Sequence, residues 1–296
     1  TRVRSSAASD VYKRQAIGRA ALTSDTKGSR SVAIGYAALQ DQNFTTATDS
    51  HNTAVGFEAA KNITTGVQNT VIGGSTGDDI TTGDNNTAVG VSAMGGGSGS
   101  TTGNDNSCFG NAAGFNLTSG TNNTLIGHDA GRTGSPGGVI TTHSNQINLG
   151  DENVSEANIQ VSLTVASDER DKTDFVNLDL GLDFIKALEP VTYYWDKRSK
   201  YGDKYAEDYD LNAQTPDGTH KEDWMDIGFK AQAVRDLEEA AGYTAAAKKN
   251  LTVSLTEDGK QYGLKYEKFI PILVKAIKDQ DAIITSLTAR IAALES

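Results

Sequence analysis

Ser167 and Lys172 are the two residues whose types and spacing could do covalent chemistry. They lie five positions apart in the charged stretch Ser167-Asp168-Glu169-Arg170-Asp171-Lys172, so a turn could bring the hydroxyl and the amine together. A serine hydroxyl is a weak nucleophile until a neighbouring base takes its proton. A lysine amine can be that base only where burial or a nearby cation favours its neutral form, and Arg170 could supply such a cation. Without further context, such a pair in a charged loop is more often two solvated side chains.

Other residue types that could support chemistry give weaker patterns. Cys108 is the only cysteine, so an intrachain disulfide is impossible and we expect a small buried apolar residue. The histidines have no metal-ligand spacing and are expected to be exposed polar residues, although a ring of His or Asp on a threefold axis could bind an ion. The Gly-rich run Gly95–Gly99 lacks the Gly-Lys-Ser/Thr ending of a phosphate loop and is interpreted as a flexible insertion. No cofactor or metal is predicted. The histidines are His51, His128, His143 and His220.

The composition divides the chain near residue 150. Of the 31 glycines, 24 lie at or before Gly150, whereas 14 of the 20 aromatic residues and both tryptophans lie after it. Only the second half therefore has the composition of an ordinary globular core. The net charge of −11 argues against nucleic acid or an anionic membrane as the main partner.

The chain has no run of about 18 apolar residues to cross a bilayer, and its N-terminus lacks the apolar stretch of a signal peptide. We therefore expect either release by lysis or a missing true start. Residues 1–15 are basic and free of glycine, unlike the glycine-rich repeats after them, and are interpreted as a fragment junction or an artefact.

An internal repeat runs through the first half. Two small or apolar residues followed by glycine recur seven times, and the glycines are 17, 20 or 21 residues apart. The base period of 17 with short loop insertions predicts stacked repeat units, each with a short strand and a tight turn at the glycine, because one such unit cannot bury its own apolar pair. Neighbouring repeats and neighbouring chains would cover it. The glycines are Gly18, Gly35, Gly56, Gly73, Gly90, Gly110 and Gly127.

Residues 16–150 resemble the repeats of trimeric adhesin heads and phage tail-fibre shafts, through units such as Ser31-Val32-Ala33-Ile34-Gly35 and Asn52-Thr53-Ala54-Val55-Gly56. The resemblance implies a trimeric β-roll or solenoid-like shaft that could bind a host receptor or glycan. The alternative is a monomeric β-solenoid with no binding role, but the few large apolar residues per repeat count against it.

Residues 151–166 are predicted to connect the two halves as a strand. Ile159, Val161, Leu163 and Val165 alternate with mainly polar residues, which predicts a half-buried strand leading into Ser167.

From Ser167 onward, four sequence blocks resemble those of the endosialidase-type intramolecular chaperone family and occur in the same order as in that family. They are Ser167-Asp168-x-Arg170-x-Lys172, the segment 181–195 (GLDFIKALEPVTYYW), the segment 227–234 (IGFKAQAV) and the segment 266–278 (YEKFIPILVKAIK). The resemblance implies an α+β chaperone domain over residues 167–296 that trimerises, helps the upstream fibre to fold and then cuts itself off. Ser167 would be the nucleophile and Lys172 the base, with Asp168 and Arg170 in support. Lys230, where an apolar residue is expected, and the polar insertion 197–223 depart from the family pattern.

The bond that breaks depends on ring size. Attack by the Ser167 hydroxyl on the Ala166 carbonyl passes through a five-membered ring, whereas attack on its own carbonyl needs a strained four-membered one. We therefore favour the Ala166–Ser167 bond. If the hydroxyl acts from another chain or through water, the Ser167–Asp168 bond becomes possible.

The end of the chain has a heptad pattern typical of a coiled coil over about residues 267–296. Ile at a with Leu at d favours a parallel dimer by pattern alone, so the trimer rests on the two resemblances. The alternative is a helix packed on its own domain. We also predict a helix at 180–188, a strand at 191–195 and a helix after Gly228. The a and d residues are Ile270, Leu273, Ile277, Gln280, Ile284, Leu287, Ile291 and Leu294.

Three functions are considered. The first is a phage tail-fibre or tailspike fragment in the virion, whose single-turnover serine endopeptidase acts only on itself. The second is a cellular trimeric surface adhesin that keeps the C-terminal domain as an uncleaved cap. The third is a glycan-degrading tailspike, but the repeat half shows no paired carboxylates in an aromatic cleft.

Overall fold

The computed structural model describes residues 14–96, 100–206, 208–247, 249 and 251–295. The chain forms two compact units. One contains residues up to 156 together with residues 197–215, and the other contains residues 157–196 and those from 216 onward. Among the described residues, no helix is long and apolar enough to cross a membrane. The predicted N-terminal artefact at 1–15 and the predicted flexible insertion at 95–99 lie largely or partly outside the described residues.

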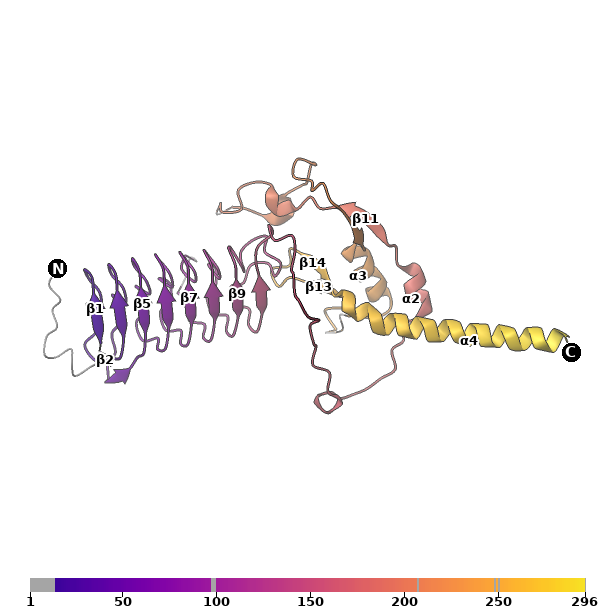
Figure 1. Cartoon of the computed structure of the whole chain (residues 1–296), viewed down its shortest axis with the longest axis horizontal. Coiled ribbons are helices and arrows are strands. Elements are labelled where there is room, and N and C mark those ends of the chain that lie inside the picture. The colour runs from indigo at the N-terminus through magenta and orange to yellow at the C-terminus, as the bar shows by residue number, and fades with distance from the viewer. Residues whose placement is uncertain (1–13, 97–99, 207, 248, 250, 296) are drawn as a thin grey trace. The chain divides into compact units, whose positions relative to one another are not determined.

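The repeat unit is a β-solenoid, which confirms the predicted fold (Figure 1). Eight short strands stack in parallel into one sheet, one strand per turn. A second, two-stranded parallel sheet joins β2 (Gly28–Ser29) to β4 (Thr48–Asp49). The eight strands are β1 (Gln15–Ile17), β3 (Val32–Ile34), β5 (Thr53–Val55), β6 (Thr70–Ile72), β7 (Thr87–Val89), β8 (Ser107–Phe109), β9 (Thr124–Ile126) and β10 (Ile147–Leu149).

The sheet register aligns the central residue of each strand into one buried column. Ala33 pairs with Ala54, Ala54 with Val71, and so on to Leu125, and every member from Ala33 to Leu125 is fully buried. The Ala-Ala pairs after the glycines are also buried within this single chain, as at Ala59 and Ala60. Small residues are therefore needed to fit the inside of each narrow turn.

Asparagines before the strands form a second buried column. The Asn86 side chain accepts a hydrogen bond from the backbone N–H of Asn106 at 3.0 Å and donates one to the Gly103 carbonyl at 2.9 Å. The same pattern recurs along the column, so each turn is joined to the next by side-chain amides as well as by the sheet. The column consists of Asn52, Asn69, Asn86, Asn106 and Asn123.

The repeated glycine is required by both backbone angle and space. Gly56 has a φ of +142°, and a Cβ placed there would lie 2.1 Å from the Gly73 carbonyl oxygen. Any larger residue would therefore push adjacent turns apart.

The last strand of the solenoid lies within the predicted repeat region 16–150 but after the seven glycine motifs. β10 pairs in parallel with β9, and Asn148 takes the position that Leu125 has in the preceding turn. The glycine motif does not continue into this turn, because a polar residue replaces the central apolar one and the spacing from Gly127 to Gly150 is longer.

The second unit is a small α/β region followed by a long helix, again as predicted. Its core contains Leu180, Phe184, Val234, Val253, Phe269 and Ile272. The predicted helix at 180–188 is confirmed as α2, the strand at 191–195 as β11, and the helix after Gly228 as α3. The elements are α2 (Leu182–Ala187), β11 (Val191–Tyr194), β12 (Met225–Gly228), α3 (Ala231–Ala240), β13 (Val253–Leu255), β14 (Tyr262–Leu264) and α4 (Phe269–Glu295).

The predicted connecting strand at 151–166 does not form in this chain. Residues 159–166 have no strand partner, and Val161, Leu163 and Val165 are each more than 70% exposed. The prediction of a half-buried strand is therefore wrong for the single chain, because the alternating pattern supplies an apolar face but not a neighbouring strand to cover it.

Candidate functional site

Ser167 and Lys172 lie side by side, as their spacing predicted. The Lys172 Nζ donates hydrogen bonds to the Ser167 Oγ at 2.5 Å and to the Ser167 carbonyl oxygen at 3.1 Å. A single 3-10 turn, η1 (Glu169–Asp171), separates the two residues and brings them together. The pair is therefore within proton-transfer distance.

Asp168 and Arg170 shape this turn. Asp168 is the N-cap of η1, and its carboxylate accepts a hydrogen bond from the Arg170 backbone N–H at 2.9 Å. The Arg170 guanidinium also binds both carboxylate oxygens, at 3.0 and 2.6 Å. These bonds to Arg170 lower the pKa of Asp168 below its ordinary value. Arg170 thus has its charge paired with Asp168 rather than directed at Lys172.

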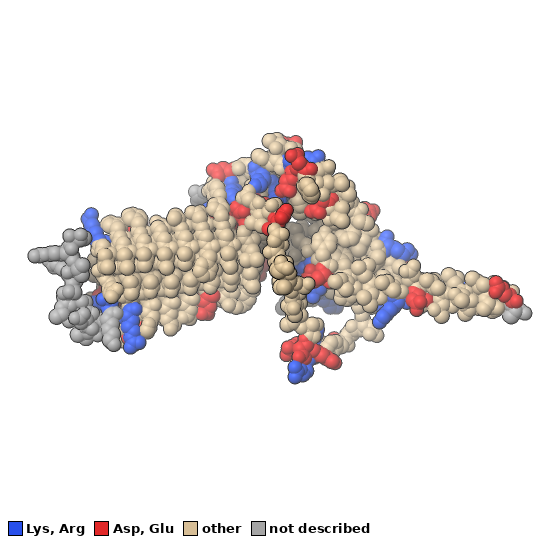
Figure 2. All heavy atoms as spheres, viewed as in Figure 1, with Lys and Arg blue, Asp and Glu red and all other residues tan. Residues whose placement is uncertain are grey.

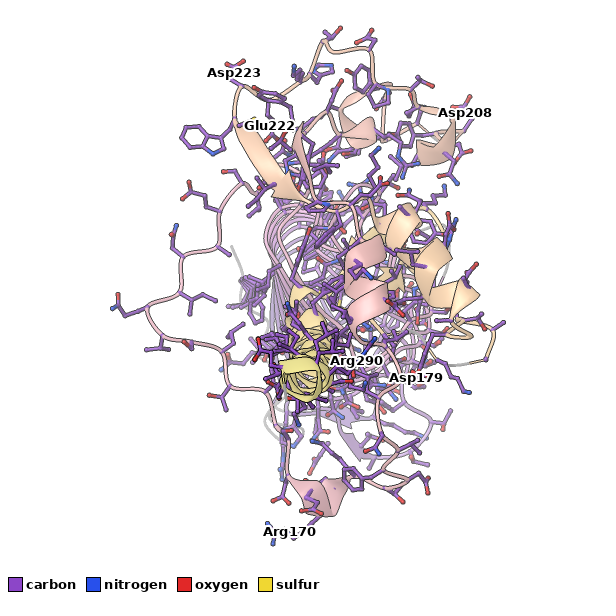
Figure 3. All side chains as sticks on the ribbon, turned by 90° about the vertical axis from the view of Figure 1, so that its right-hand side faces the viewer. Arg170, Asp179, Asp208, Glu222, Asp223 and Arg290 are labelled. Carbon is purple, nitrogen blue, oxygen red and sulfur yellow. The ribbon has the colours of Figure 1, made fainter. Side chains whose placement is uncertain are left out.

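The turn is exposed in the single chain. Figure 3 shows Arg170 extending from the turn, and its side chain is 88% exposed. Apolar residues on both sides of the turn are exposed as well, including Val165, Phe175 and Val176 at 74%, 67% and 88%. The turn and the apolar residues on both sides of it are therefore open to solvent in the single chain.

Cys108 is buried in the central column of the solenoid, as predicted. Burial raises the pKa of its thiol to about 12, which makes it a poor nucleophile.

One histidine has carboxylate neighbours that the sequence did not indicate. Ligand atoms of His128, Asp129 and Asp151 lie within 4.8 Å of one another. Asp129 is already bound by two cations, Arg132 at 3.1 Å and Lys204 at 3.2 Å. Asp129 is thus part of an ion-pair network with Arg132 and Lys204.

The helix α4 carries the predicted heptad residues as an exposed stripe. The seven apolar a and d residues are between 44% and 87% exposed, whereas Ile272 and Ala276 contact the domain core. The helix therefore packs on its own unit along one side near its start and leaves the heptad face uncovered.

Residues 167–243 match the family model described as the chaperone of endosialidase. The match begins at Ser167 and includes the first three of the four sequence blocks that resemble this family, and it ends before the block at 266–278. No curated protein and no solved structure was found to match the chain.

These findings define a β-solenoid joined to a C-terminal intramolecular chaperone segment. Residues 167–243 are similar to the chaperone of endosialidase, as the family model describes it. The roles of Ser167, Lys172, Asp168 and Arg170, and the bond on either side of Ser167 that would break, stay predictions.

Proposed function

We propose that residues 167–296 help the repeat half to assemble into a homotrimer and then cut themselves off through Ser167 and Lys172. The observation that carries this proposal is the 2.5 Å contact between the Lys172 Nζ and the Ser167 Oγ at the first residue of the matched chaperone segment. Nucleophile and base in direct contact are the minimum arrangement for serine chemistry.

The reaction would proceed in two balanced steps. In the first step, the neutral Lys172 amine takes the proton of the Ser167 hydroxyl, and the Ser167 Oγ attacks the Ala166 carbonyl carbon. The C–N bond then breaks, the Ser167 nitrogen takes up the proton, and an ester joins Ala166 to the Ser167 Oγ. Water hydrolyses this ester, which leaves a carboxylate at Ala166 and a free amine at Ser167. Each chain reacts once, so no pocket for an external substrate is needed.

Two exposed apolar stripes support a homotrimer. One is the heptad face of α4. The other is a row on the β-sheet made by the residue that follows the buried central residue in each strand. The large apolar side chains of this row are between 36% and 60% exposed. On the face shown in Figure 2, the repeat unit also carries few charged side chains. A solitary chain would leave both stripes in water, whereas parallel copies would cover them. The second row contains Ile17, Ile34, Ile72, Phe109, Ile126 and Leu149.

We further propose that the chain is part of a phage tail fibre or tailspike, carried on the virion, with the repeat half as a structural shaft or host-adhesion surface. Because the turns of the shaft are similar to one another, a domain that aligns three chains before the turns stack would favour the correct register. A surface adhesin with a permanent cap would have the same oligomer but no cut.

Substitutions at the dyad test the cleavage. Ser167→Ala and Lys172→Ala should each leave one full-length band on a denaturing gel, because one removes the nucleophile and the other the base. The matched control is Ser155→Ala, an exposed serine in the same connecting region, which should cut like the unmodified chain. Equal cutting in Ser167→Ala would refute the assignment. Loss of folding in both dyad variants would refute the separation of chemistry from core.

A further inference from the structure

The polar insertion in the chaperone segment contacts the repeat unit rather than its own. β11 and β12 pair antiparallel, with Tyr194 opposite Met225, so the chain leaves and returns at the same point of this hairpin. Between them, residues 197–215 form one compact unit with the solenoid, while the residues on both sides belong to the other unit. We call residues 197–215 the docking segment.

Lys204 is the charged anchor of the docking segment. Its Nζ lies 2.6 Å from the Glu152 Oε1 and 3.2 Å from the Asp129 Oδ2. The three side chains are only 12%, 5% and 2% exposed. Removing one partner of such a buried pair leaves an uncompensated charge, which is strongly unfavourable.

Lys204 and Asp129 shift each other's pKa. Burial alone would lower the pKa of Lys204, but Glu152 and Asp129 together raise it above the ordinary 10.5. Burial alone would raise the pKa of Asp129, but the Tyr205 hydroxyl, Lys204 and Arg132 together lower it below the ordinary 3.8. Both groups are therefore charged in the docked state across neutral pH.

Tyr205 adds a second contact beside the anchor. Its hydroxyl donates a hydrogen bond to the Asp129 Oδ2 at 2.7 Å. Its ring lies under the Arg132 guanidinium, whose central carbon is 4.8 Å from the ring centroid. The Tyr205 hydroxyl and the Lys204 amine of the docking segment thus both bind the Asp129 carboxylate.

The start of the docking segment binds the backbone just after the last strand. The Lys197 Nζ donates to the Glu152 carbonyl at 3.0 Å, and the Lys200 Nζ donates to the Asn153 side chain. Ser199 is 8% exposed and packs so tightly that a Cβ on Gly134 would lie 2.7 Å from the Ser199 Cβ. The docking segment therefore covers the final turn of the solenoid, where the next repeat would otherwise stack.

We propose that the docking segment is a non-covalent latch that caps the last turn of the solenoid and keeps the C-terminal fragment attached after the chain is cut before Ser167. The solenoid residues in the contacts described above, from Asp129 to Asn153, lie before the cut, and the docking segment itself lies after it. Release of the chaperone is then a second step, limited by opening of the Lys204 contact. The order of these two steps rests on the proposed self-cleavage, but the latch does not.

The test cuts the chain without using its own chemistry. A recognition site for an added sequence-specific protease is placed within residues 157–166 of a chain carrying Ser167→Ala. After cutting, gel filtration at decreasing concentration measures the dissociation constant of the two fragments. They should coelute, and Lys204→Ala should raise the dissociation constant at least about a hundredfold. The control Lys186→Ala, a 67% exposed lysine on α2, should leave it unchanged.

A milder variant keeps the test informative if Lys204→Ala does not fold. Tyr205→Phe keeps the ring and removes only the hydrogen bond to Asp129, so the dissociation constant should rise about fivefold, with an unchanged circular dichroism spectrum. Immediate separation of the cut Ser167→Ala fragments at neutral pH, or equal retention in Lys204→Ala, would overturn the latch. Failure of the unmodified chain to cut itself would count only against the proposed function.

Discussion

Asn86→Ala isolates the contribution of the asparagine column to the shaft. The Asn86 side chain is fully buried and holds the next turn at two places, the Asn106 backbone N–H at 3.0 Å and the Gly103 carbonyl at 2.9 Å. It also accepts a hydrogen bond from the Asn106 side chain at 3.1 Å, but that amide keeps its bond to the Gly120 carbonyl. Alanine therefore leaves two buried backbone groups without these partners.

The expected loss is the sum over those two groups. A buried polar group left unsatisfied costs about 1–3 kcal/mol, so two of them predict a decrease of about 2–6 kcal/mol in the free energy of unfolding. Adjacent turns stabilise each other, so the loss should appear as earlier melting of the whole repeat unit.

Urea denaturation followed by circular dichroism measures this change. The matched control is Thr82→Ala, an exposed residue shortly before Asn86 in the chain, which should change the free energy by no more than about 0.5 kcal/mol. If Asn86→Ala were as mild as Thr82→Ala, the side-chain amides would not be what joins the turns, and the stabilising role given to the column would be refuted.

Three further predictions concern other parts of the chain. Cys108, whose thiol pKa is raised to about 12 by burial, should resist alkylation in the folded protein and react fully in denaturant; rapid labelling of the folded chain would contradict its place in the core. Ile284→Asp, on the exposed heptad face of α4, should reduce the assembled mass measured by light scattering, whereas Asp281→Asn should not, and equal masses would remove the helix from the interface. Retention of the cut C-terminal fragment should be constant from about pH 4 to pH 10. It should weaken below the ordinary carboxyl pKa of 3.8 as Asp129 is protonated, and above the ordinary lysine pKa of 10.5 as Lys204 loses its proton. Retention that stays constant below pH 3 would contradict the ion pair.

The repeats could be predicted from the sequence because a solenoid uses the same local rule in every turn. A glycine at positive φ and a central apolar residue recur with a base period of 17 residues, and each contacts its equivalent in the next turn. The motif changes only in the last turn, at Asn148, which lies within the predicted repeat region. The Ser167–Lys172 contact was also predictable, since five residues span one short turn.

Long-range placement could not be predicted in the same way. Lys204 is one of many charged residues in a polar insertion, and nothing local indicates that it meets Asp129, 75 positions earlier, in a buried pair. The strand predicted from the alternating residues Ile159 to Val165 does not form, although here the local pattern was clear. A strand pattern reports an apolar face, but pairing depends on an edge that this chain alone does not provide.

In the proposed function, the C-terminal domain helps the repeat half to fold and assemble. The most direct measurement compares the full chain with a chain that ends at Ala166, expressed identically, by the yield of soluble protein with a cooperative β-sheet melting transition. We expect the shortened chain to be insoluble or to melt without a cooperative transition, and the full chain, cut or uncut, to give a stable shaft. A shortened chain that folds alone with the same yield and the same melting temperature would contradict the chaperone role.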